Sequence, residues 1–441
     1  MVQRTHGRVK LRVITPVRLP CPRCRRSGKR VGVVDAWARD MGYREEVWVH
    51  SKLGVYESRC ACQDYFQAEN PDAPHHWMYT VAVREAVVNA IVRDHLSSQK
   101  VQSRFQEDFL LELSQGFIFE CLAWADKRFN SEAHFRSVAK QFSGVLCVDE
   151  LYDGDFKIIF ATDPQLNETI GFRVVDAATR EKVEPFLIEL RERGITPRTI
   201  MTDDSNLYPD MLQTVWPGVE HRTCVFHYEM TVGKAVIRAV RKVAKKLRGA
   251  PKRRRGRPSR RGAPRKKVSD RDFVNKNRFL AVKKDENLTE RERELLPKFL
   301  GLHPELRDLR DFTTALRNLF EPGTTQQQAR NRRTRLLQRP IIDAYPQLRH
   351  IAKRLTGESF EKLISFLKSD DGQRTNNHVE RKNRGFRMIQ KTRYRHRTQA
   401  RIEQAIRLDL ARRSCPRQAP ARIHGPRNPV KSAQEKESMA A

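Results

Sequence analysis

The spacing of apolar positions changes several times along this chain, and each change predicts a different kind of element. Residues 9–17, 45–50 and 54–60 have the alternation of short strands joined by turns. From about 78 to 130 the spacing becomes helical, and three short helices are predicted. The apolar face of the first helix contains Val83, Val87, Ala90, Ile91 and Leu96. Ser114 is placed to cap the third helix.

The next segment, between residues 141 and 228, alternates buried strands with amphipathic helices. The predicted strands cover 145–150, 156–163, 169–176, 198–204 and 220–227. A helix at 180–194 ends at Gly194, and a shorter one is expected at 206–218. The order βββαβαβ predicts a mixed sheet covered by helices.

The remainder of the chain is basic and mostly helical. Residues 234–267 contain 17 Lys and Arg and no acidic residue, and their Gly- and Pro-rich middle predicts a flexible basic tether. Helical, charged text resumes over 270–370 and continues through the helix that carries Glu380. Beyond Cys415 the composition is Pro-rich and polar, which is typical of disorder.

The charge balance indicates what kind of partner the chain binds. The 441 residues include 86 Lys and Arg against 53 Asp and Glu, a net charge of +33. Such an excess favours a polyanionic partner, most simply double-stranded DNA. A membrane partner is disfavoured because no run approaches the ~18 apolar residues of a spanning helix. No apolar segment of a secretory signal follows Met1, so a cytoplasmic, nucleoid-associated protein is expected.

Two aspartates at predicted strand ends are the first candidates for chemistry. Asp149 closes one apolar strand and Asp203 closes another. Carboxylates from neighbouring strands are suited to hold Mg²⁺, which prefers oxygen ligands, and a helix carboxylate such as Glu380 would complete the cage. Asp also ends strands for its turn preference, the role expected of Asp163 and Asp176.

Alternatives remain at two of these positions. Asp204 stands beside Asp203 and competes for the second place in the cage. Glu380 has Arg384 four residues later, so an ordinary ion pair on a helix surface is the simplest explanation for it.

As an ordered set, these motifs resemble a known family. VDE after an apolar strand, TDDSNLYPDML, CVFH and TNNHVERKNRGFR look like the DDE transposases of prokaryotic insertion sequences. The closest likeness is to mutator-like and related groups with a C-x2-H motif and an all-helical insertion. The resemblance covers roughly 80 to 412. It implies an RNase H-like catalytic core in which Asp149, Asp203 and Glu380 bind Mg²⁺ or Mn²⁺ and catalyse strand cleavage and transfer.

The resemblance also implies roles for residues around the carboxylates. Cys224 and His227 of the C-x2-H motif would organise the sheet end next to the active site, supported by Asn376 and Asn377. Zinc at Cys224 and His227 is not expected, because no second ligand pair stands nearby in the sequence. The cations expected to face DNA on the glutamate helix are Arg381, Arg384 and Arg387.

Paired cysteines near the start of the chain predict a separate zinc site. CPRC has the spacing of a zinc knuckle, and two residues of a strand at i and i+2 can reach one ion. The four expected ligands are Cys21, Cys24, Cys60 and Cys62. His50 is an alternative ligand, and free thiols are the alternative to a metal site. Some transposases similar to this chain carry such a zinc ribbon ahead of a helix-turn-helix.

Two further segments are expected to touch DNA. Ser114 and Gln115 begin the third helix, which would be the recognition helix of a helix-turn-helix. Arg254, Arg255 and Arg257 belong to RRRGRP, which resembles an AT-hook core. A solvated charge run that binds phosphates anywhere explains this short motif equally simply.

Together these features predict an α+β mixed architecture and a DNA transposase that works as a homo-oligomer on DNA. The expected parts are a zinc-ribbon-like segment (1–75), a helix-turn-helix domain (78–132), the first part of an RNase H-like core (141–230), a basic tether with a helical insertion (231–370), the last part of the core with the Glu380 helix (371–414), and a disordered tail (415–441). The alternative functions are a catalytically inert, transposase-derived DNA-binding regulator and an RNase H-like nuclease.

Overall fold

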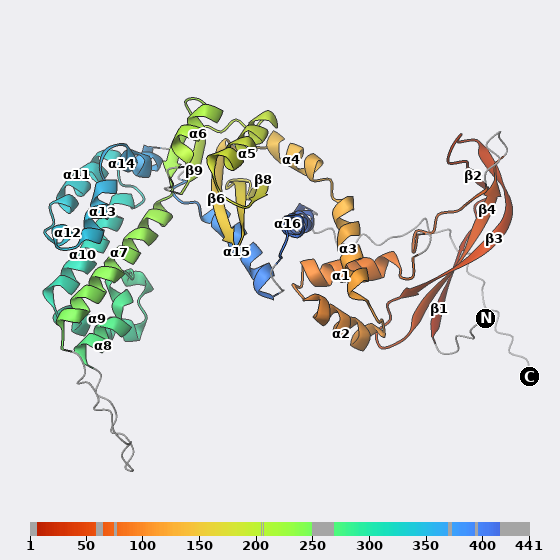
Figure 1. Cartoon of the computed structure of the whole chain (residues 1–441), viewed down its shortest axis with the longest axis horizontal. Coiled ribbons are helices and arrows are strands. Elements are labelled where there is room, and N and C mark those ends of the chain that lie inside the picture. The colour runs from red at the N-terminus through yellow and green to blue at the C-terminus, as the bar shows by residue number, and fades with distance from the viewer. Residues whose placement is uncertain are drawn as a thin grey trace, which may run out of the picture. The chain divides into compact units, whose positions relative to one another are not determined.

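The computed structural model describes most of the chain, in two compact units (Figure 1). The described residues are 7–58, 65–74, 77–203, 205, 207–248, 269–368, 373–392 and 396–414. The first unit combines 1–134 with 387–441, and the second spans 135–386. Among the described residues, no helix combines the length and apolar character needed to cross a bilayer.

A β-sheet opens the first unit. Its strands are β1 (Arg8–Ile14), β2 (Arg18–Pro20), β3 (Ser27–Asp40), β4 (Val47–Glu57) and β5 (Tyr65–Gln67). The order is β1-β4-β3-β2, and β5 pairs with β4. The two strands expected at 45–50 and 54–60 are one continuous strand, β4. The polar residues between them do not break it, because Ser51 and Leu53 continue its buried face and β3 pairs along its whole length.

The three predicted helices of the first unit are confirmed. They are α1 (Val81–Val92), α2 (Ser98–Phe109) and α3 (Gln115–Arg128). The Ser114 side chain accepts a hydrogen bond from the Phe117 backbone N–H and caps α3 as expected. Helix α16 (Gln399–Ser414) packs on α1 and α3, where Arg407 binds Asp126 through two hydrogen bonds of 2.8 Å.

The second unit is built on the mixed sheet that the pattern predicts. Its strands are β6 (Val145–Asp153), β7 (Phe156–Asp163), β8 (Glu168–Val175), β9 (Thr199–Thr202) and β10 (Glu220–Thr223). The order is β10-β9-β6-β7-β8; β6, β7 and β8 pair antiparallel, and β9 and β10 add in parallel. Helices α5 (Arg180–Glu192) and α6 (Tyr208–Val215) share one hydrophobic core with the sheet, joined by the end of α4 (Ser131–Lys140).

In the residues that the structure describes, the insertion between the sheet and the Glu380 helix is all-helical. It contains α7 (Val225–Lys246), α8 (Asp270–Lys276), α9 (Glu290–Gly301), α10 (Pro304–Arg317), α11 (Gln326–Leu337), α12 (Ile341–Ala344), α13 (Pro346–Arg354) and α14 (Gly357–Ile364), with short 3-10 turns η1 (Arg278–Ala281), η2 (Asp285–Asn287), η3 (Asn318–Phe320) and η4 (Ser365–Lys368). One continuous core joins these helices to α7, which runs through the bundle (Figure 1). Helix α15 (Asn377–Thr392) follows the insertion.

Two expectations about the start of the insertion are wrong. The fifth strand ends at Thr223, and residues 224–227 cap and begin α7 instead of extending the strand. The first part of the predicted tether, 234–246, is the second half of α7. Its apolar residues bury a face that includes Val236, Val240 and Val243, which charge counting alone concealed. The Gly- and Pro-rich middle lies outside the described residues.

Candidate metal centre

The register of two parallel strands brings Asp149 and Asp203 together. Strand β6 pairs with β9 so that Cys147 lies opposite Met201. Continued by two residues, this register sets Asp149 beside Asp203. Asp149 does not close its strand as expected, because β6 runs on to Asp153. It lies two residues beyond the last pair of β6 with β9, which ends at Thr202.

Five acidic and histidine side chains gather at this point in two overlapping groups, which share Asp149. One group contains Asp149, His227 and Glu380, and the other contains Asp149, Glu150 and Asp203. Within each group, one ligand atom from each residue lies within 4.8 Å of the others. Two of the three carboxylates singled out in the sequence, Asp203 and Glu380, are therefore neighbours of the third, Asp149.

Glu380 meets a histidine rather than an arginine. His227 Nε2 lies 2.9 Å from Glu380 Oε1, which ties the first turn of α7 to the first turn of α15. Arg384, the helix-surface partner considered for Glu380, is exposed. Hydrogen bonds to Cys224 and Glu380 raise the pKa of His227 to about 10, so the metal-free protein holds this imidazole as a cation.

Asp149 is nearly enclosed and is held in place by an amide. Its side chain is 5% exposed, and Asn383 Nδ2 donates a hydrogen bond of 2.9 Å to its Oδ2. Burial, together with the negative charges of Glu380, Glu150 and Asp203, raises the pKa of Asp149 to about 8, although the His227 charge opposes the rise. Such crowding of carboxylates is relieved by a cation.

Sequence reasoning missed Glu150, Tyr208 and Asn383 as members of the site. The Tyr208 hydroxyl, fully buried on α6, donates to Glu150 Oε1, and burial raises the pKa of Glu150 to about 6. Asn383 was given no role. A carboxylate directly after Asp149 and an amide three residues after Glu380 were visible signals, but their partners are more than 50 residues away.

Three of the four residues expected beside the ligands, Cys224, His227 and Asn376, lie there. The Asn376 backbone N–H points to Cys224 Sγ at 3.1 Å, and its side-chain amide donates to the Val148 carbonyl at 3.0 Å. Cys224 N–H in turn donates to the Thr202 carbonyl. The C-x2-H motif thus joins β9, α7 and the segment leading into α15. Asn377 is exposed at the start of α15.

Other aspartates take the turn role expected of them. Asp163, fully buried, accepts from the backbone N–H groups of Ser143, Gln165 and Leu166. Asp176 accepts from the Ala177 N–H at 2.8 Å. Asp204, the competitor of Asp203, lies outside the described residues.

The positions expected to face DNA divide into two sets. Those in the described part of the chain are exposed: Ser114, Gln115, Arg381, Arg384 and Arg387. The tether positions Arg254, Arg255 and Arg257 lie outside it.

Half of the expected zinc ligands can be placed. Cys21 and Cys24 occupy the loop of the β2–β3 hairpin, where Cys21 N–H donates to the Arg26 carbonyl at 2.8 Å and Arg25 N–H donates back to Cys21 at 2.9 Å. Cys60 and Cys62 lie outside the described residues. His50 is not an alternative ligand. It stacks on Trp37 and bonds Asp35 at 2.7 Å, about 25 Å along β4 from Ser58, the neighbour of Cys21.

The donor set at Asp149 fits a hard divalent cation. Mg²⁺ and Mn²⁺ take carboxylate oxygens, and four carboxylates with one imidazole converge here. Burial and then the nearby carboxylates raise the pKa of Asp149, and a bound cation would favour its charged form.

Comparison with known proteins gives a match to a family model and matches to solved structures. A family model described as a transposase, for the ISL3 group of DDE enzymes, matches residues 146–405. No curated protein sequence matches significantly. A solved Drosophila P element transposase strand transfer complex is similar over 75% of this chain and 92% of that chain, with 11% identity and a TM-score of 0.36, a value from which we draw no conclusion.

Proposed function

The chain belongs to the ISL3 family of DDE transposases, and we propose that it binds the ends of a transposon and catalyses metal-dependent cleavage and transfer of DNA strands. The observation that carries the proposal is the convergence of Asp149, Asp203 and Glu380, from two parallel strands and a distant helix, on one buried point. We assign the sheet and α15 to an RNase H-like core, with α7–α14 as its insertion.

Each side chain has a definite task in this proposal. Asp149, Asp203 and Glu380 hold the cation, and His227 orients the Glu380 carboxylate beside Asp149. Asn383 fixes the rotation of the Asp149 carboxylate through its 2.9 Å hydrogen bond. Mg²⁺ held by these carboxylates would activate the attacking oxygen and stabilise the leaving oxygen. Glu150, held by Tyr208, is close enough to add a ligand.

DNA is held by the exposed cations of α15 and by the helix-turn-helix. Arg381, Arg384 and Arg387 recur at a three-residue spacing on one side of the helix that carries Glu380, so phosphates bound there lie next to the carboxylates. The amino-terminal end of α3, capped by Ser114, is exposed and reads the transposon end.

A zinc ion completes the start of the chain in this proposal. The hairpin loop that carries Cys21 and Cys24 has the turn of a zinc knuckle, in which backbone N–H groups point back to the first thiol. Cys60 and Cys62 supply the remaining ligands.

Separate measurements of DNA binding and of cleavage test the main proposal. The substrate is a duplex with the inverted repeats that flank the gene. Glu380→Gln keeps the shape of the side chain and the contact to His227 but removes a ligand charge. It should bind the duplex at least as well as wild type, whereas Mg²⁺-dependent cleavage falls by orders of magnitude. Asp149→Asn and Asp203→Asn should behave alike.

Arg384→Ala is the matched contrast, with weaker binding and residual cleavage at high protein concentration. A Glu380→Gln protein that cleaves at the wild-type rate would exclude the three-carboxylate site. A wild-type protein that binds the repeats but never cleaves them would favour the inert regulator instead.

A further inference from the structure

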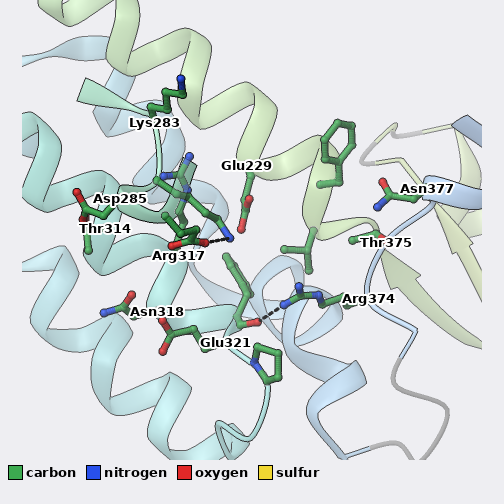
Figure 2. Close-up of a pocket in the computed structure, with 16 residues that line it drawn as sticks. Glu229, Lys283, Asp285, Thr314, Arg317, Asn318, Glu321, Arg374, Thr375 and Asn377 are labelled. Atoms are coloured by element: carbon green, nitrogen blue, oxygen red, sulfur yellow. Dashed lines mark hydrogen bonds and ion pairs between the residues drawn. The ribbon is translucent and has the colours of Figure 1, made fainter. Parts of the chain in front are cut away.

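A cavity lies where the helical insertion leaves the catalytic sheet and returns to it. Its volume is about 320 Å³. Its walls come from the first turn of α7, residues 283–286 at η2, the end of α10 with η3, and the segment 374–377 that leads into α15. Figure 2 shows Arg374, Thr375 and Asn377 on one side of this space and Arg317, Asn318 and Glu321 across from them. The helix packing leaves this space open.

The cavity adjoins two segments that carry residues of the metal centre, although none of the five side chains of that centre lines it. Phe226, in its wall, precedes the histidine that bonds Glu380. Asn377, on the opposite side, begins the helix that carries Glu380 three residues later. The two walls are joined by a 3.0 Å hydrogen bond from the Val225 N–H to the Arg374 carbonyl. The cavity therefore lies between the segment that leads to His227 and the segment that leads to Glu380.

The lining combines an aromatic ring, carboxylates and cations, groups that together can bind the base and the phosphate of a nucleotide. Phe226 is 41% exposed, which is unusual for a large apolar side chain beside a buried site. Arg317 donates to the Val282 carbonyl at 2.5 Å, and Arg374 donates through Nη1 to the Phe320 carbonyl at 3.0 Å, so both guanidinium groups are anchored at the wall. Glu229 lies near Arg317, and its negative charge stabilises the charged form of that guanidinium group.

We propose that this cavity receives a single nucleotide unstacked from the DNA strand next to the cut. The inference rests on the proposed transposase function and names a further binding site for it. Phe226 stacks on the displaced base, and the Glu229 carboxylate accepts a hydrogen bond from an amino group on the base edge. The anchored guanidinium groups of Arg317 and Arg374 face the flanking phosphate.

The physical need for such a pocket follows from the depth of the site. Asp149 is 5% exposed, so a phosphate inside a straight, fully stacked duplex does not reach it without distortion. Moving one nucleotide aside frees the backbone to turn inward, and its unstacking is offset by new stacking on the protein. Met230, 40% exposed one turn after Phe226, extends the apolar edge that can hold the duplex apart.

A fluorescent base tests the proposal independently of cleavage. A flanked inverted-repeat duplex carries 2-aminopurine at successive positions around the cut, and its emission rises when the base loses its stacking neighbours. Glu380→Gln protein in Ca²⁺ serves as the binding-competent reference. One position should brighten with this protein, and Phe226→Ala added to it should remove the change. Phe226→Trp retains a ring that can stack on the base. This variant should therefore keep the brightening that Phe226→Ala removes.

Cleavage by otherwise wild-type Phe226→Ala should fall about 5- to 100-fold on the intact duplex. It should recover on a duplex that is abasic at the same position, because nothing then has to be unstacked. Phe279→Ala is the matched control: this insertion phenylalanine is 52% exposed on η1, away from the cavity lining, and should change neither reading.

The outcomes separate this inference from the function on which it rests. Wild-type cleavage without brightening at any position, or a Phe226→Ala defect that the abasic duplex does not correct, overturns the pocket and leaves the transposase intact. Brightening without cleavage by the wild type supports the pocket and counts against the catalytic proposal. Tight calorimetric binding of a free nucleoside monophosphate, lost in Phe226→Ala, would assign the cavity to a free nucleotide and overturn the strand proposal.

Discussion

Removing the amide of Asn383 should weaken metal binding without changing DNA binding. Asn383 is 2% exposed and donates its 2.9 Å hydrogen bond to Asp149, the carboxylate shared by both groups of the metal centre. Asn383→Ala leaves this carboxylate able to rotate away from its neighbours. Asn383→Leu removes the same donor but keeps approximately the volume of the side chain.

The size of the effect follows from the nature of the bond. A hydrogen bond to a charged acceptor contributes about 1.5–3 kcal/mol. At 1.4 kcal/mol for each factor of ten, losing this hydrogen bond corresponds to about a 10- to 100-fold loss of affinity. Losses of this size are typical when a residue that orients a metal ligand is replaced. Both variants should therefore bind Mn²⁺ about 10- to 100-fold more weakly.

Isothermal titration of the full chain with Mn²⁺ measures the loss, and calorimetric unfolding without metal shows whether each variant folds. Asp163→Asn is the control, since this buried aspartate organises a turn on the same sheet without joining the carboxylates. It should lower stability and leave Mn²⁺ affinity unchanged. If Asn383→Leu is folded and binds Mn²⁺ with wild-type affinity, the residue serves packing and the positioning role is refuted.

Three other predictions concern separate parts of the chain. Cys21→Ser should lower bound zinc well below one equivalent by metal analysis and unfold the start of the chain, while calorimetry still shows the unfolding transition of the unit 135–386. Deleting 249–267 should weaken binding to all DNA alike and lower the log–log salt slope by about 0.9 per lost phosphate contact, whereas a loss confined to A·T-rich duplexes would favour the AT-hook. Burial lowers the pKa of His221 to about 4, so its contribution to stability is intact above about pH 6.5 and is lost as the pH falls toward 4. His221→Gln, which can keep the bond to Thr202, should flatten this acid limb in calorimetric unfolding, and an unchanged limb would contradict the assignment.

The periodicity of apolar residues determined most of the local structure. The three helices before residue 130, the five-stranded sheet and the helical insertion all follow from spacings of about two or 3.6 residues, because each element must bury one face. The prediction failed where a strongly cationic helix also has a buried apolar face. In α7 a helix with many cations on its solvated side buries Val236 and Val240 on the other, and the charge count concealed that face.

The sequence also identified the carboxylates that meet, but only through their order along the chain. The spacing of 54 residues between Asp149 and Asp203 equals the register offset of β6 and β9, which pair Val145 with Thr199. That equality has no meaning until the two strands are known to be parallel neighbours. Local sequence determines which strands form. How the strands pair depends on how elements distant in sequence come together in the fold.

Only the tertiary structure decided the immediate surroundings of the site. Glu380 contacts His227, 153 residues away in the sequence, and Asn383 contacts Asp149, 234 residues away. Tyr208 of α6 contacts Glu150 of β6. A side chain's polar partner depends on where two backbones cross, and no short-range periodicity records that crossing. The cavity beside Phe226 has the same origin, since it exists only where the insertion leaves the sheet and rejoins it.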